Sequence, residues 1–211
     1  MLAQKVKRNQ SPNPTCTVAQ ASVITGVPVK VINQYIDRDF AGLQLAVLQD
    51  GVRSISADKV IALRLAFDFA DTLTVAARTQ LIQVALAMPR AKRIKLDGGN
   101  VIVPVDFARS SVKAGSKRMT AAIGGVQFDA GIMGGEPCLK GTRISVYTVA
   151  DLHDASGRDA VVDAYDITDQ QLDAAVVFAL SFPRRGRPRG MEAKLDAAKP
   201  KARRTKSIKI D

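Results

Sequence analysis

The break at Thr25-Gly26-Val27-Pro28 constrains the fold of this 211-residue chain more than any other feature of its sequence. Before the break, Thr17 can cap a helix that Gly26 ends, and after it Pro28 can open a second helix running to about Asp39. The apolar positions of both segments recur at helical spacing: Val18, Ala21, Ile24, Val27, Val31, Ile32, Tyr35 and Ile36. The sequence therefore predicts two short helices joined by a tight turn, a helix-turn-helix pattern.

Turn and cap residues continue to divide the chain beyond this pair. Asp50-Gly51 between two extended segments predicts a β-hairpin, which in this position would be a wing. Ser56 and Thr74 are each placed to cap a strongly apolar helix. A second hairpin is predicted to turn on Asp97-Gly98-Gly99, and Asp106 is predicted to cap a polar helix after it. The region after the wing should therefore be mostly helical.

Gly124-Gly125 is the clearest linker signal in the folded part, and we place a domain boundary near it. Beyond it we expect a short hairpin and three helices at about 146–155, 158–165 and 168–182. The predicted fold class is mainly α: a winged helix-turn-helix, a small three-helix domain with a β-hairpin, and a disordered basic C-terminal tail. The predicted parts are a flexible lead-in (1–16), a winged helix-turn-helix (17–56), a helical middle region with a hairpin (57–123), a helix-turn-helix domain (126–182) and the tail (183–211).

The positive charge of the chain is concentrated near its end. The formal net charge is +11, and from residue 183 onward eleven lysines and arginines face three acidic residues, a net +8. The preceding residues therefore carry only +3. A stretch this rich in Pro, Gly, Lys and Arg cannot bury a core, so we expect it to be disordered when free. Its charge favours a polyanion or an acidic partner.

Several classes of protein are disfavoured by the sequence. The apolar stretch 60–69 is interrupted by Arg64 and Asp68, so no segment resembles a membrane span. The first residues lack the apolar core of a secretory signal, and we expect a cytoplasmic protein. Cys16 and Cys138 have no second Cys or His at metal-ligand spacing. We therefore predict no metal and no cofactor.

An enzymatic role is also disfavoured. The only histidine, His153, has no Ser or Cys nucleophile at motif spacing, and we interpret it as a helix-surface residue. We therefore predict neither catalysis nor a small-molecule substrate.

The second predicted helix has a polar face suited to DNA. Lys30, Asn33, Gln34 and Arg38 share that face because they lie three or four residues apart. Asn and Gln suit adenine edges, and Arg suits guanine or phosphate. Arg53 in the wing can reach a neighbouring phosphate. The sequence thus predicts DNA binding in the major groove, and the alternative is a plain helical hairpin with a solvated polar face.

This N-terminal segment resembles the winged helix of MerR-type regulators. The residues that carry the resemblance are 17–21, 25–28 and 31–38. It implies that the first helix packs across the second, that the second reads DNA, that the wing touches the backbone, and that the protein binds as a dimer. The chain departs from that family at Val31 and Asn33, where arginines are usual, and it shows no long C-terminal coiled-coil helix.

The most specific string in the chain is Gly134-Gly135-Glu136-Pro137-Cys138-Leu139-Lys140-Gly141-Thr142-Arg143-Ile144-Ser145-Val146. It resembles the signature of a prokaryotic family of unknown function, DUF433, and the resemblance extends to Leu180. Members of that family include VapB-type antitoxins, so the resemblance implies a helix-turn-helix domain, a partner toxin of the PIN ribonuclease type and autorepression of an operon. Physically, Gly141 can make a sharp turn, while Thr142 and Arg143 can tie the hairpin to the following helices.

The start of the basic tail, residues 183–190, resembles an AT-hook, whose arginines lie in a narrow minor groove. We expect its arginines to bind either the minor groove or the acidic groove of a toxin: Arg184, Arg185, Arg187 and Arg189. The alternative is a tail that only improves solubility.

Taken together, the sequence favours a homodimeric antitoxin of a type II toxin-antitoxin system. It would neutralise a PIN-type ribonuclease and repress its own operon by binding double-stranded operator DNA. The two alternatives are a stand-alone DNA-binding regulator without a toxin and a pure protein-interaction module.

Overall fold

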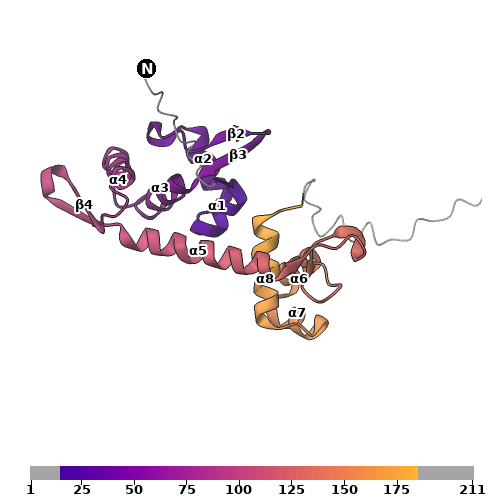
Figure 1. Ribbon diagram of the computed structural model, residues 1–211. Coiled ribbons are helices and arrows are strands. Elements are labelled where there is room, and N and C mark those ends of the chain that lie inside the picture. The colour runs from indigo at the N-terminus through magenta and orange to yellow at the C-terminus, as the bar shows by residue number, and fades with distance from the viewer. Residues whose placement is uncertain (1–14, 185–211) are drawn as a thin grey trace, which may run out of the picture.

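The computed structural model describes residues 15–184 (Figure 1). The fold is mainly helical with small hairpins, which confirms the predicted fold class for the described part of the chain. The predicted lead-in up to residue 14 and the tail beyond Arg184 lie outside the described residues.

The predicted helix pair is confirmed. Helix α1 spans Val18–Thr25 and helix α2 spans Val29–Asp37. Thr17 caps α1 through a reciprocal capping box with Gln20, which satisfies two backbone N–H groups at the start of the helix. Gly26 ends α1 with φ 73°, a left-handed conformation that glycine adopts without steric cost.

The β-hairpin predicted at Asp50-Gly51 is also confirmed, and it belongs to a three-stranded antiparallel sheet in the order β1-β3-β2. Strand β2 spans Val47–Gln49 and β3 spans Val52–Ser56, joined by the Asp50-Gly51 turn with φ of 50° and 74°. The third strand, β1 at Thr15–Thr17, corrects the prediction of a flexible lead-in over residues 1–16. Cys16 lies opposite Ile55, so the open edge of β3 orders a segment that carries no turn or periodicity signal of its own.

The middle region contains the predicted helices and second hairpin. Thr74 caps its helix by accepting a hydrogen bond from the Ala77 backbone, whereas Ser56 occupies an N-cap position without a side-chain bond. Asp106 lies in the first turn of its helix and Val105 takes the N-cap position, which corrects the predicted cap. The elements are α3 (Ala57–Asp68), α4 (Val75–Ala87), β4 (Arg93–Leu96), β5 (Val101–Pro104) and α5 (Asp106–Gly124), with short 3-10 turns at Phe40–Gly42 and Asp97–Gly99.

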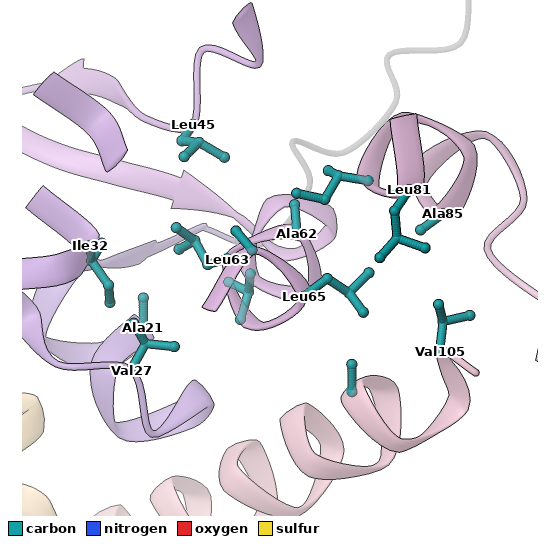
Figure 2. Close-up of a cluster of buried hydrophobic side chains, with 14 of the residues drawn as sticks. Ala21, Val27, Ile32, Leu45, Ala62, Leu63, Leu65, Leu81, Ala85 and Val105 are labelled. Atoms are coloured by element: carbon teal, nitrogen blue, oxygen red, sulfur yellow. The ribbon is translucent and has the colours of Figure 1, made fainter. Parts of the chain in front are cut away.

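One hydrophobic cluster joins the helices of this part to its two hairpins (Figure 2). It takes fully or almost fully buried side chains from helices α1 to α5 and from strands β3, β4 and β5, including Ile32, Ile55, Leu63, Leu81 and Ile94. Removing a side chain of this size from water stabilises a fold by about 1.5–3 kcal/mol. The two hairpins are therefore fixed at their roots to the same core as α2.

Helix α5 crosses α1 at Gly115, in the interior of the helix. A Cβ at this position would overlap the backbone carbonyl oxygen of Ile24 and lie 2.9 Å from its Cα. Glycine lowers intrinsic helix stability by about 1 kcal/mol, but here it permits direct backbone contact between two helices. Arg118, one turn further along α5, donates a hydrogen bond to the Val23 carbonyl at 3.2 Å. This crossing holds α5 against the helix-turn-helix.

The C-terminal part forms a second cluster around the three predicted helices. Thr168 caps α8 through a reciprocal capping box with Gln171. The buried residues are Val126, Leu139, Val146, Val149, Val161, Ile167, Leu172, Ala175 and Phe178. The elements are β6 (Val126–Gln127), β7 (Cys138–Leu139), α6 (Val146–Ser156), α7 (Arg158–Tyr165) and α8 (Asp169–Ser181), with a 3-10 turn at Met133–Gly135.

Gly124 is the last residue of α5, and β6 begins at Val126. Helix α8 packs against both α5 and α1, as Figure 1 shows, and a Cβ at Gly125 would lie 3.1 Å from the Cβ of Ala174. The two clusters are therefore joined by helix packing as well as by the chain. No helix within residues 15–184 is long and apolar enough to cross a membrane.

Candidate nucleic-acid interface

A row of polar side chains runs along the outer face of α2. Lys30, Gln34 and Arg38 are exposed and lie four residues apart, so they share one face of the helix. Ile32, on the opposite face, is fully buried in the N-terminal cluster. Three of the five predicted DNA contacts thus project together from a helix that is fixed from behind.

The turn before α2 is held by side chains as well as by Gly26. Ser22 Oγ donates to the Val27 carbonyl at 2.7 Å, and Thr25 Oγ1 accepts from the Val27 backbone N–H at 3.1 Å. Arg64 of α3 donates to the Thr25 carbonyl at 2.6 Å and pairs with Asp68 at 2.7 Å. These bonds satisfy the polar groups where α1 ends, and they fix the direction in which α2 leaves the turn.

The other two predicted contacts, Asn33 and Arg53, bind each other. Arg53 Nη1 donates to Asn33 Oδ1 at 2.7 Å, and Arg53 Nη2 pairs with Asp37 Oδ1 at 2.5 Å. Asp37 was missed from the sequence, although it lies one turn after Asn33 and thus on the same face. The wing arginine is therefore oriented by α2, and its charge is matched by a carboxylate.

The tip of the wing is apolar. Val47, Leu48 and Val52 are 51%, 75% and 41% exposed. The β2–β3 hairpin therefore exposes an apolar tip to solvent. Arg53 is the one cation of this hairpin.

The motif residues in the C-terminal part build a local turn. Gly141 has φ 78°, a left-handed backbone conformation that glycine adopts without steric cost. Thr142 Oγ1 donates to the Leu139 carbonyl at 2.9 Å and accepts from the Ile144 N–H at 3.1 Å. Among the described residues, the exposed side chain of Arg143 makes no hydrogen bond or ion pair, so the structure does not show the predicted tie from Arg143 to the following helices.

Arg184 is bound to the same motif. Its guanidinium pairs with Glu136 and lies over the Tyr147 ring, 4.6 Å from the ring centre. Glu136 also accepts a hydrogen bond from Ser145 Oγ at 2.9 Å. Arg184 is thus occupied within the domain, whereas we had predicted it to contact toxin or DNA. The other tail arginines, Arg185, Arg187 and Arg189, lie outside the described residues.

The two cysteines and the histidine, for which we predict no metal-binding or catalytic role, lie in ordinary structural surroundings. Within residues 15–184 no cluster of His, Cys, Asp or Glu has the arrangement of a metal site. Burial raises the pKa of the Cys16 thiol to about 11. The pKa of Cys138 is raised mainly by burial and further by the nearby Glu136 carboxylate. His153 lies on α6 with Nδ1 3.5 Å from Asp154 Oδ1.

A hollow of about 500 Å³ lies between α1 and α8, and its lining includes Val29, His153 and Arg158. Arg158 forms ion pairs of 2.5 Å with Asp169 and with Asp173. The hydrogen bonds to these two carboxylates are the main cause of its raised pKa. Arg158 is therefore matched by two carboxylates of α8.

Comparison with protein families identifies part of the chain. Residues 126–179 match the model described as protein of unknown function, DUF433. This part of the chain is a DUF433 domain. It contains the Gly141-Thr142 turn, the Glu136 site that holds Arg184, and most of the second hydrophobic cluster. Neither the curated proteins nor the solved structures gave a match.

Proposed function

We propose that the protein is a DNA-binding regulator that reads double-stranded DNA with α2. The observation that carries this proposal is the row of Lys30, Gln34 and Arg38 on the exposed face of a helix whose other face is buried. The arrangement of α1, α2 and the β2–β3 hairpin supports a winged helix-turn-helix of the MerR-like kind.

The chemistry of the row suits the major groove. Arg38 can donate two parallel hydrogen bonds to guanine, Gln34 can pair with an adenine edge, and Lys30 can contact a phosphate. A dimer would place two such helices about one helical turn of DNA apart, so the preferred site should be an inverted repeat. The fixed position of α2 lowers the entropic cost of binding, because the helix needs no ordering on contact.

The test compares binding to a duplex spanning the region upstream of the protein's own gene with binding to a scrambled duplex of equal composition. The wild-type chain should prefer the upstream duplex. Gln34→Ala and Arg38→Ala should each cost about 1–3 kcal/mol of discrimination, because each removes a donor to a base edge. Lys140→Ala, which removes an exposed charge from the DUF433 domain, is the matched control and should leave the preference unchanged. Equal binding of both duplexes by the wild-type chain would contradict the proposal.

A second candidate is favoured by the DUF433 domain and by the +8 charge after residue 182. In it, the regulator is the antitoxin of a type II toxin-antitoxin pair, and it neutralises a PIN-type ribonuclease while repressing their shared operon. A basic tail suits such a partner because arginines pair with the carboxylates that hold metal ions in a ribonuclease groove.

Co-expression with the product of the adjacent open reading frame tests the antitoxin function. Relief of growth arrest together with co-purification supports it, and a chain truncated after Arg184 should then lose relief while keeping DNA binding. A neighbour that is neither toxic nor bound leaves the stand-alone regulator.

A further inference from the structure

The β4–β5 hairpin carries a basic surface that the function proposed above does not use. Four of the six residues from Arg90 to Lys95 are lysine or arginine, and none is acidic. All four cations are exposed: Arg90 and Lys92 in the connection that leads into β4, and Arg93 and Lys95 on the strand itself. We call these four side chains the hairpin cations.

The alternation of side chains along β4 places apolar residues in the core and charged residues on the outer face of the hairpin. Ile94 and Leu96 are 2% and 3% exposed, so the alternate positions Arg93 and Lys95 face outward. Their partners across the ladder are Pro104 and Ile102, and Ile102 is 55% exposed. The outer face of this two-stranded ribbon therefore places two charged side chains beside two apolar ones.

The ribbon is held firmly at its base. Arg109 of α5 donates to the carbonyls of Met88 at 3.1 Å, Ala85 at 3.4 Å, and Ala91, which fixes the connection from α4 to β4. The backbone N–H of Val105 bonds to the Lys92 carbonyl at 2.9 Å. The hairpin cations thus project from a backbone that is ordered before any ligand binds.

The hairpin cations differ in their partners from three other described arginines. Arg53, Arg64 and Arg158 are each matched by a carboxylate at 2.7 Å or less. No ion pair joins a hairpin cation to any carboxylate among the described side chains. A concentration of exposed, unmatched cations on a rigid ribbon suits an extended polyanion.

We propose that the β4–β5 hairpin is a second wing that contacts the phosphate backbone of the DNA bound by α2. In Figure 1 this hairpin and the β2–β3 hairpin stand at opposite ends of the N-terminal part; α2 lies beside the β2–β3 hairpin, α3 and α4 lie between α2 and the β4–β5 hairpin, and α5 runs along the other side. One duplex would then receive α2 in its groove and meet the hairpin cations at flanking phosphates. Phosphate contacts carry no sequence information, so this wing adds affinity and orientation. The inference rests on the proposed DNA binding.

The experiment measures the affinity of the wild-type chain and of an Arg93→Gln/Lys95→Gln double variant for the upstream and scrambled duplexes over a series of salt concentrations. Each phosphate contact contributes about 0.9 to the slope of log K against log salt, so the variant should lose about 2 from that slope. At 0.1 M salt this corresponds to a loss of affinity on the order of tens of fold for both duplexes. The ratio between the duplexes should not change.

The matched control is Lys113→Gln/Lys117→Gln, which removes two exposed charges from α5. It should keep the wild-type slope, since α5 lies on the other side of the N-terminal part (Figure 1). Thermal unfolding checks that both variants fold, and light scattering reports their oligomeric state.

The outcomes separate the two proposals. Wild-type binding to both duplexes without preference, with a reduced slope in the hairpin variant, supports the second wing and contradicts base reading by α2. Preference for the upstream duplex with an unchanged slope in the hairpin variant overturns the second wing alone. In that case aggregation of the variant would assign the cations to protection of the hairpin edges, and loss of the dimer would assign them to self-association. A wild-type chain that binds neither duplex overturns both.

Discussion

The two hairpins of the N-terminal part are anchored in the same hydrophobic cluster, but they differ in the side chains that they expose. Both insert buried isoleucines, Ile55 and Ile94, into one hydrophobic cluster. The first hairpin has an apolar tip and a single cation, Arg53, that is paired with Asp37 of α2. The second hairpin, together with the connection that leads into β4, carries four exposed cations without described carboxylate partners. Similar backbone elements thus present different surfaces: one places Arg53 against α2, and the other leaves its charges without a described carboxylate partner.

The largest effect should come from the shared root. Ile55→Ala and Ile94→Ala should each lower the free energy of unfolding by about 2–5 kcal/mol, because each leaves a cavity in the same cluster. Urea unfolding measures both. Val52→Ala and Ile102→Ala, at positions 41% and 55% exposed, are the controls and should cost far less. A large loss at only one root would show that the other hairpin is peripheral to the core.

The second effect concerns the charge that distinguishes the hairpins. Asp37→Asn should make the first hairpin resemble the second, because it removes the carboxylate that neutralises Arg53. DNA affinity should rise and the salt slope should steepen by about 1, as one more cation meets phosphate. Asp163→Asn, an exposed position on α7, is the control for a general change in net charge. An unchanged slope would place Arg53 away from the DNA backbone.

A third, smaller effect uses Cys16, which lies opposite Ile55 at the first root. Burial raises its pKa from 9.0 to about 11, so above pH 9.0 the unfolded chain releases this proton while the folded chain keeps it. Stability should therefore fall as the pH rises from 9.0 toward about 11. Urea unfolding across this range measures the loss, and Cys16→Ala should reduce it. An equal loss in the variant would assign the dependence to other groups, such as Tyr35, whose pKa is also raised.

The smallest effect should be on the stability of the second hairpin itself. Arg93→Gln and Lys95→Gln should each change the free energy of unfolding by no more than about 0.5 kcal/mol, because both side chains are exposed. Thermal unfolding measures this. A loss of several degrees would mean that these charges stabilise the fold and would weaken the comparison.

Local sequence signals predicted most of the elements, because caps and turns depend on residues that are close together in the sequence. The Thr17 cap, the helix end at Gly26 and the Asp50-Gly51 turn all behave as expected. The strand at Thr15–Thr17 was missed because its partner lies some 40 residues away and its own residues carry no pattern. Gly115 lowers the helix propensity of its segment, yet it lies inside the 19-residue α5.

The side-chain partners were harder to predict than the elements. Arg53 and Asn33 were each named for their chemistry, but their contact with each other depends on how the wing folds back on α2. Arg184 was grouped with the tail by composition, whereas Glu136 and Tyr147 bind it. The hairpin cations were visible in the sequence as an alternation of charged and apolar residues. The larger charge of the tail masks this signal in the overall composition.

The crossing at Gly115 limits how this sequence can vary. Every other amino acid would place a Cβ where the Ile24 carbonyl lies, so a substitution must move either α1 or α5. A shift of α1 would also move α2, since one short turn joins the two helices. We therefore expect related chains to keep glycine at this position while the exposed residues of α5 diverge. A relative that has lost it should show a compensating change around Ile24.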